Sequence, residues 1–265
     1  KIRNSNVAKG EAGGITQQIG STFVPANSVI DMCTKLRPKL SENWKKNNPQ
    51  FQNVPDNELP SEASMLTIDK YNLPGLLCID TPGHESFSML RERGGDICDV
   101  AILIVDIQQG LQQQTIESIQ ILKERETPVI IAVTKVDALY SWNKDPENAF
   151  NPIQDSLANS KQIVKNEFER QYEKAMVQFA EQEINVKLFW DNPDPDTYTN
   201  MVPVSSKTGE GLPDLLNLLV EMTMKRMSAR LTRQNVSYND FRCIVLEVKN
   251  QEGQGTTLDV VLANG

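Results

Sequence analysis

Along the middle of this chain, short continuous apolar runs alternate with longer segments in which apolar residues recur at helical spacing. Three short, continuous apolar runs rich in Val and Ile are typical of buried parallel strands, and they lie at 100–105, 129–133 and 201–204. Four longer segments have apolar residues at helical spacing, and they lie at 85–97, 112–125, 155–184 and 212–231. This strand–helix alternation predicts an α/β fold, in which a mostly parallel sheet carries helices on both faces.

The pattern differs on the amino-terminal side of this region. Residues 26–60 are polar and contain four prolines among many Asn and Gln residues, which predicts an irregular insertion. Residues 65–68 and 76–79 flank a Pro-Gly pair, and this arrangement predicts a β-hairpin.

A second strand pattern begins near residue 235. The runs 241–248 and 256–262 flank a Gly-Gln-Gly turn and predict the opening hairpin of an all-β domain. We therefore divide the chain into an α/β domain at 1–234 and the start of a β domain at 235–265. The chain begins at Lys1 rather than Met, so we expect it to be a piece of a longer protein.

The overall charge of the chain bears on which classes of binding partner it can have. A net charge of −8 argues against a broad nucleic-acid-binding surface, because phosphate binding needs concentrated Lys and Arg. One polar segment at 35–46 is locally basic, and solvated helix or loop faces are the simpler explanation for it. Widely spaced cysteines without a C-x-x-C pair indicate a reduced intracellular protein. No apolar run approaches the ~18 residues that a membrane span needs.

The pentapeptide Asp80-Thr81-Pro82-Gly83-His84 follows the apolar run at 76–79. Ligands of open α/β sheets bind outside the carboxyl ends of the strands, where Asp80 is expected. Its carboxylate can hold a metal, and the Gly83 backbone lets an N–H approach a phosphate closely. His84 can orient or deprotonate a water molecule.

Two more polar loops follow apolar runs further along the chain. Thr134-Lys135-Val136-Asp137 ends the run at 129–133, and the Asp137 carboxylate can accept two hydrogen bonds from a guanine edge. The stem of Lys135 can lie along a flat ring. Ser205-Ser206-Lys207 follows the run at 201–204 and offers backbone N–H groups to a base carbonyl. Upstream, Thr16 lies in a glycine-rich loop suited to Mg²⁺ and a terminal phosphate.

Taken in chain order, these motifs resemble those of translational GTPases. The segments 10–20, 80–87, 114–118 and 189–211 narrow the resemblance to the family of eukaryotic initiation factor five-B and its bacterial relative, initiation factor two. The resemblance covers nearly the whole chain apart from 26–60. It implies a P-loop-NTPase-like G domain followed by the first strands of a β-barrel domain.

The resemblance also implies roles for residues around the phosphates. Thr16 would close over Mg²⁺ and the γ-phosphate, and Asp80 would approach the same ion through water. The Gly83 N–H would sense the γ-phosphate. His84 would orient the attacking water, and Ile15 would shield that water.

Other residues would bind the base. Lys135 and Asp137 would read guanine, with help from Thr134 and the loop Ser205-Ser206-Lys207. The family hydrolyses GTP to GDP and phosphate on the ribosome, with Mg²⁺, to drive joining of the ribosomal subunits during initiation. The implied setting is the cytoplasm. The implied partners are the ribosomal subunits, other initiation factors, and initiator tRNA bound through a domain outside this chain.

The sequence departs from the family in one serious respect, because it contains no first strand and no G-x-x-x-x-G-K-[ST] loop. That loop supplies the main phosphate cradle. We therefore expect this chain to bind nucleotide poorly by itself. The absent strand belongs in the middle of the sheet, so we also expect unpaired strand edges that favour self-association. Thr134 and Ser206 replace the commoner Asn and Ala, with modest expected effects.

Two alternatives remain open at this point. The same fold could serve as a nucleotide-free interaction module, and the upstream sequence would discriminate because only an enzyme needs the phosphate-binding loop. A GTPase that acts outside translation, for example in RNA modification, is the other alternative.

Overall fold

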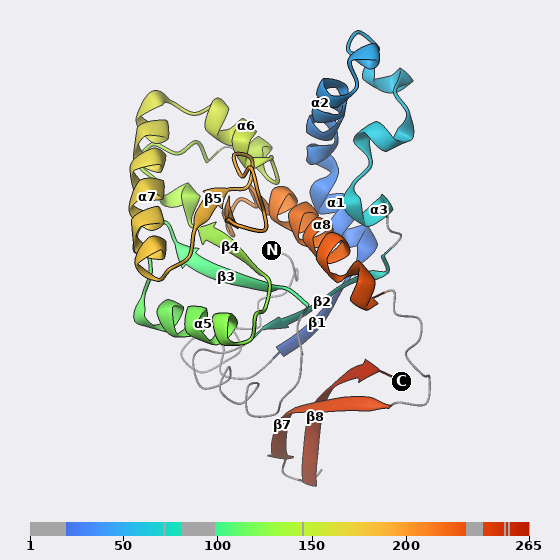
Figure 1. Cartoon of the computed structure of the whole chain (residues 1–265), viewed down its shortest axis with the longest axis vertical. Coiled ribbons are helices and arrows are strands. Elements are labelled where there is room, and N and C mark those ends of the chain that lie inside the picture. Colours follow the sequence, from blue (N-terminus) through green and yellow to red (C-terminus); the bar gives the residue numbers. More distant parts are fainter. Residues whose placement is uncertain are drawn as a thin grey trace.

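The computed structural model describes residues 20–70, 73–80, 99–144, 146–231, 241–251, 253 and 255–264. Its centre is a parallel four-stranded sheet in the order β3-β4-β6-β5, with helices against it (Figure 1). The strands are β3 (Ala101–Asp106), β4 (Val129–Thr134), β5 (Val186–Leu188) and β6 (Thr199–Pro203). The helices that accompany it are α5 (Gln113–Glu124), α6 (Ile153–Ala158), α7 (Gln162–Glu181) and α8 (Leu212–Leu231). The predicted α/β fold is confirmed.

Alternate residues of the central strands bury side chains on opposite faces of the sheet. On one face, residues such as Ile131 and Val133 of β4 pack in a cluster with Ile119 of α5 and Phe179 of α7. On the other face, Ile130, Ala132 and Val202 pack with residues of α8. Both faces of β4 are therefore covered, which explains its unbroken apolar sequence.

The helix predicted over 155–184 is two helices, because the chain breaks between α6 and α7. Asn159 caps the end of α6, and the Ser160 hydroxyl donates to the Ser156 carbonyl across 2.7 Å. Side-chain bonds of this kind compete with the helical ladder and favour helix ends. The short strand β5 was also absent from the sequence prediction.

The hairpin predicted over 65–79 is wrong. The strand β2 (Gly75–Asp80) instead pairs antiparallel with β1 (Gly20–Pro25), in a register that places Gly20 opposite Asp80. Thr67–Lys70 form the short helix α3, and Leu66 and Ile68 are buried in a cluster that includes Leu216 of α8. The strand partner of β2 is therefore β1, which is distant in sequence, and not the adjacent segment 65–68.

The irregular insertion predicted over 26–60 is also wrong, because much of it is helical. It contains α1 (Ala26–Cys33) and α2 (Arg37–Asn47), which Figure 1 shows rising beside α8. Pro25 caps α1 and Pro38 lies in the first turn of α2, where proline is compatible with a helix. Short 3₁₀ turns complete the chain at Thr34–Leu36, Pro49–Phe51, Asp56–Glu58, Ser61–Ser64, Val136–Ala138 and Pro146–Asn148.

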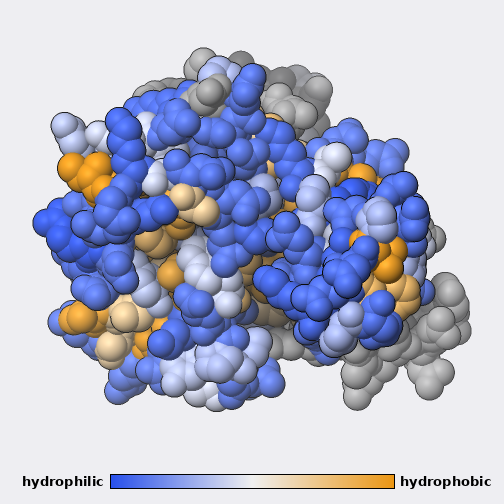
Figure 2. Space-filling model, turned by 90° about the horizontal axis from the view of Figure 1, so that it is seen from above, coloured by the Kyte–Doolittle hydropathy of each residue, from blue (hydrophilic) through white to orange (hydrophobic). Residues whose placement is uncertain are grey.

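The basic segment at 35–46 is largely paired within the molecule. Its ion pairs and hydrogen bonds are Arg37 with Asp69, Lys39 with Asp155, Lys45 with Asp56, and Lys35 with the Glu147 carbonyl and Asn151. Hydrophilic residues cover most of the face seen from above in Figure 2, and hydrophobic residues form only small separate patches there. Lys35, Arg37 and Lys39 therefore anchor the insertion to the rest of the domain, whereas Lys45 joins two parts of the insertion itself.

Two strand edges and a separate hairpin complete the fold. Among the described residues, β2 and β3 each have one neighbouring strand, and Leu77 of β2 and Ile104 of β3 are more than half exposed. The predicted carboxyl-terminal hairpin is present as β7 (Arg242–Gln251) and β8 (Gly255–Asn264), and the boundary at 234/235 lies outside the described residues. No helix in the described part of the chain is long and apolar enough to cross a bilayer.

Candidate functional site

The loops that follow β3, β4 and β6 meet at one edge of the parallel sheet. Asp106 ends β3 directly opposite Thr134, which ends β4. The Thr134 hydroxyl donates to the Val105 carbonyl across 3.2 Å, so it braces the end of the neighbouring strand. The chain leaves β6 beside β4, where the Val204 N–H donates to the Val133 carbonyl across 2.8 Å. Residues from three strands are thus placed together, as expected for parallel strands.

Lys135 turns the chain sharply at the end of β4. Its backbone is left-handed, with φ 64°, and its side chain is exposed. The ammonium Nζ lies 2.7 Å from Oδ2 of Asp106, and the Gln108 N–H donates to Oδ1 across 2.9 Å. Burial opposes ionisation of the Asp106 carboxyl, but the hydrogen bond from Lys135 and those from the Gln108 and Gln109 backbone outweigh it and lower the pKa. The Lys135 side chain is thereby tied to the end of β3.

Asp137 is buried in the turn after Lys135, with 4% of its surface exposed. The Ser205 hydroxyl donates to Asp137 Oδ1 across 2.7 Å. The same hydroxyl oxygen accepts the backbone N–H groups of Lys207 (3.2 Å) and Thr208 (3.1 Å). Ser206 and Lys207 themselves are exposed. One serine therefore fixes an acidic side chain in one loop against the backbone of the next.

The other predicted site residues are distributed differently. Asp80 ends β2 and is exposed, in the two-stranded sheet that β1 completes. Ile15, Thr16, Gly83 and His84 lie outside the described residues. The structure thus brings together the loop residues from Thr134 to Asp137 and from Ser205 to Lys207.

Sequence reasoning missed three residues that belong to this site. Asp106 had a usable signal, because it is an acidic residue directly after a buried strand. Trp142 and Glu210 had none, since their contact joins loops that are far apart in sequence: the Trp142 Nε1–H donates to Glu210 Oε2 across 3.0 Å.

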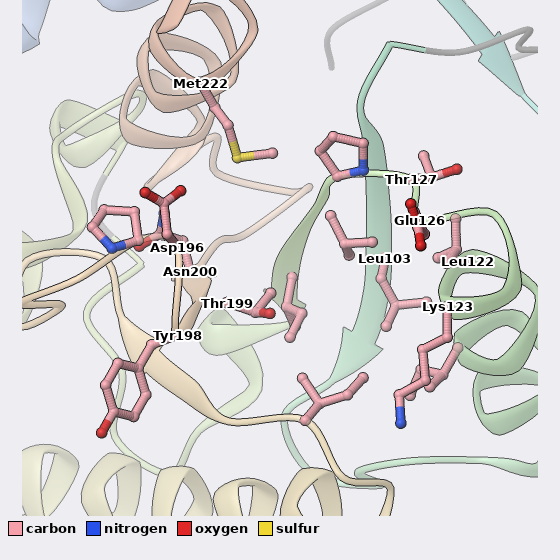
Figure 3. Close-up of a pocket in the computed structure, with 16 residues that line it drawn as sticks. Leu103, Leu122, Lys123, Glu126, Thr127, Asp196, Tyr198, Thr199, Asn200 and Met222 are labelled. Carbon is pink, nitrogen blue, oxygen red and sulfur yellow. The ribbon is translucent and has the colours of Figure 1, made fainter. Parts of the chain in front are cut away.

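A cavity of about 280 Å³ lies at the opposite edge of the sheet, near the amino ends of β4 and β6. Figure 3 shows Glu126 and Thr127 on one wall, facing Asp196 and Asn200 on the other, with Leu103 between the walls. None of the predicted site residues lines this cavity, so it is separate from the loops described above.

The site thus combines an acid-containing turn after the buried strand β4 with a serine loop after β6, its neighbour in the sheet. Residues 5–225 match the family of the elongation factor Tu GTP-binding domain. The chain therefore belongs to this family of GTP-binding domains.

The similar proteins are translation initiation factors, a narrower group within this family. Eukaryotic translation initiation factor 5B of Saccharomyces cerevisiae is 43% identical over 265 residues, which are 100% of this chain and 23% of that protein. The human factor 5B is 42% identical, with 19% of its length covered. The probable translation initiation factor IF-2 of Metallosphaera sedula is 38% identical, with 39% of its length covered.

A solved structure agrees with these relatives. The crystal structure of GDP-bound aIF5B from Aeropyrum pernix has a TM-score of 0.72 and 35% identity, and it covers 100% of this chain and 39% of that one. The resemblance to the five-B family is confirmed. The chain spans about a fifth of the length of its eukaryotic relatives.

Proposed function

We propose that this chain is the GTP-binding part of a translation initiation factor that hydrolyses GTP to GDP and phosphate. The observation that carries the proposal is the buried Asp137 carboxylate, fixed by Ser205 at the edge where the strand ends meet. A fixed carboxylate can accept both the N1–H and the 2-amino group of guanine. Thr134, Lys135, Ser206 and the backbone of the Ser205 loop would complete the base site, with Lys135 along the ring.

The proposed phosphate site combines described and undescribed residues. Gly20 lies opposite Asp80 in the β1–β2 pair and follows Thr16 by four residues, so only a short stretch of chain separates Thr16 from the strand beside Asp80. Carboxylate and hydroxyl oxygens are ligands that Mg²⁺ prefers, so this pair fits the ion. Bound Mg²⁺ would neutralise charge on the β- and γ-phosphates. Gly83 would donate its N–H to the γ-phosphate, with Ile15 as an apolar shield.

The wider setting follows from the relatives' names. A protein related to initiation factor 5B and IF-2 is expected to work in the cytoplasm with the ribosomal subunits and other initiation factors. GTP hydrolysis would drive subunit joining, and initiator tRNA would bind elsewhere in the protein. We assign residues 1–234 to the G domain, and the β7–β8 hairpin to the start of a β-barrel domain at 235–265.

Replacing His84 with Ala tests the catalytic part of the proposal. A residue that orients the attacking water contributes to the transition state more than to binding, so ribosome-stimulated hydrolysis should slow by about 100-fold with GTP affinity nearly unchanged. Single-turnover hydrolysis and nucleotide titration on a full-length protein that carries this domain separate the two effects. An unchanged rate would remove His84 from the mechanism. Failure of the wild-type protein to prefer GDP over ADP would contradict the proposed function itself.

Residues 1–265 alone are expected to bind nucleotide weakly. Their sequence has no G-x-x-x-x-G-K-[ST] loop, and phosphate contacts supply much of the affinity in such sites. Titration with a fluorescent GDP analogue would contradict this expectation if it gave a dissociation constant below about 1 µM. The edges of β2 and β3 could also pair with another copy of the chain, which sedimentation of the same sample would detect.

A further inference from the structure

Trp142 and Glu210 join the loops after β4 and β6 at a second point. The Trp142 indole N–H donates to Glu210 Oε2 across 3.0 Å, and the two residues are 6% and 0% exposed. Trp142 lies five residues after Asp137, and Glu210 lies five residues after Ser205. The two loops are therefore bonded at their beginnings through Ser205 and at their ends through Glu210.

The Glu210 carboxylate is an unusual group for this position. Its Oε2 also accepts the Thr208 hydroxyl across 2.7 Å, whereas its Oε1 is buried with no hydrogen-bond partner among the described residues. A buried carboxylate with an unpaired oxygen costs free energy, and an apolar side chain would avoid that cost. The carboxylate is therefore better explained by the geometry that its two acceptor bonds impose than by stability.

The backbone of Glu210 extends this restraint to Ser205. The Glu210 carbonyl accepts the Ser205 N–H across 2.9 Å, and the Gly209 N–H donates to the Ser205 carbonyl across 2.9 Å. Ser205 in turn donates its hydroxyl to Asp137. A continuous set of hydrogen bonds thus runs from the indole to the carboxylate that is proposed to read the base.

The end of the loop leaves little room for adjustment. Gly211 has φ +75°, and a Cβ there would lie 2.1 Å from the Pro203 carbonyl oxygen. The Gly211 N–H also donates to the Asn151 carbonyl across 3.0 Å. With its exit fixed in this way, the loop can hold the carboxylate of Glu210 at one place opposite the indole.

We propose that Glu210 and Trp142 are positioning residues for base selection. Their hydrogen bond fixes the separation of the two loops and so the orientation of the Asp137 carboxylate. Neither side chain touches the base; both act through Ser205. The inference rests on the proposed guanine-nucleotide function, and it assigns to this buried pair a share of the discrimination between guanine and bases that lack the 2-amino group.

Three variants in a full-length protein that carries this domain test the proposal. Trp142→Phe removes the N–H together with one ring of the indole, Glu210→Leu removes both acceptor bonds, and Glu210→Gln keeps an acceptor oxygen. The readout is the ratio of GDP to IDP affinity, since the base of IDP lacks the 2-amino group. The ratio should fall about tenfold in Trp142→Phe and Glu210→Leu, and Glu210→Gln should stay within about threefold of wild type.

Hydrogen–deuterium exchange of the nucleotide-free protein gives a second readout. The amides of Ser205 and Thr208 should exchange faster in Glu210→Leu than in wild type or in Glu210→Gln. Unchanged exchange in Glu210→Leu, or an unchanged GDP-to-IDP ratio in both bond-deleting variants, would overturn the proposal. If wild-type protein bound no guanine nucleotide, the proposed function would fail while the exchange comparison still decided whether the pair restrains the loop.

Discussion

Replacing Asp137 with Asn should convert a preference for guanine into a preference for xanthine. The carboxylate is buried and held at Oδ1 by Ser205, which leaves Oδ2 and the second lone pair of Oδ1 to accept hydrogen bonds from a base. An amide in its place keeps one acceptor oxygen for the N1–H but turns an N–H donor toward the 2-amino group of guanine, and two facing donors repel. Xanthine carries a carbonyl at the same position and can accept from the amide.

The expected effect is large because a site built to pair polar groups strongly rejects a mismatched partner. GDP affinity should fall roughly 100-fold and XDP affinity should rise, which changes the selectivity by roughly 10⁴-fold. Titrations of a full-length protein with both nucleotides measure it. Asp196→Asn, a change of the same kind at the opposite edge of the sheet, is the matched control and should leave both affinities unchanged. A GDP preference retained in Asp137→Asn would show that another group reads the base.

Replacing Asp214 with Asn should make the domain more stable at pH 8 than the wild type. Asp214 lies in the first turn of α8, is 4% exposed, and accepts the Ile153 N–H across 2.7 Å. Burial raises the pKa of its carboxyl to about 7, and the negative charge of Asp155 adds to the rise, while the Ile153 N–H and the charge of Lys39 oppose it. Asn can accept the same hydrogen bond without ever carrying a charge.

The sign of the pH dependence follows from that elevated pKa. The folded protein holds the Asp214 proton up to about pH 7, whereas the unfolded chain releases it near pH 4, so stability falls as pH rises between these values. Raising the pKa of Asp214 from 3.8 to about 7 costs free energy of unfolding at pH 8. This cost makes wild type less stable than Asp214→Asn by about 4 kcal/mol, as an upper bound.

Urea unfolding of the two proteins from pH 4 to pH 8 measures the difference, and Asp31→Asn on the exposed side of α1 is the control. The two stability curves should converge near pH 4, where Asp214 is neutral in the fold. Parallel curves for wild type and Asp214→Asn would show that Asp214 ionises normally.

The strands that form the candidate site are predictable because their sequences are locally unambiguous. The continuous run of β4 has the composition of a doubly covered strand, and its predicted bounds agree with Val129–Thr134 within a residue. Once parallel strands are inferred, their carboxyl ends must share an edge. The meeting of Asp137 with the Ser205 loop follows from that reasoning, although the hydroxyl-to-carboxylate bond does not.

What could not be predicted depends on contacts between distant residues. The sequence at 65–68 is apolar enough for a strand, but β1 is the partner of β2, and Leu66 and Ile68 contribute to the α8 cluster instead. The amphipathic helix α1 buries Val29 and Cys33, and the polar helix α2 is held by ion pairs with other segments, including Lys39 with Asp155. Ion pairs and strand pairings between distant segments leave no periodic signal in the sequence.

The order of the strands in the sheet has a consequence for synthesis of the chain. β5 is made before β6, yet β6 is its neighbour in the sheet, and α7 precedes both. The backbone of the three residues of β5 therefore has no strand partner until Thr199–Pro203 have been added, although α7, which Val186 and Leu188 pack against, is already made. A strand that waits with its backbone unpaired can pair wrongly, and a very short strand offers little to pair with. With only three residues, β5 leaves a short unpaired edge at the step where the sheet is still incomplete.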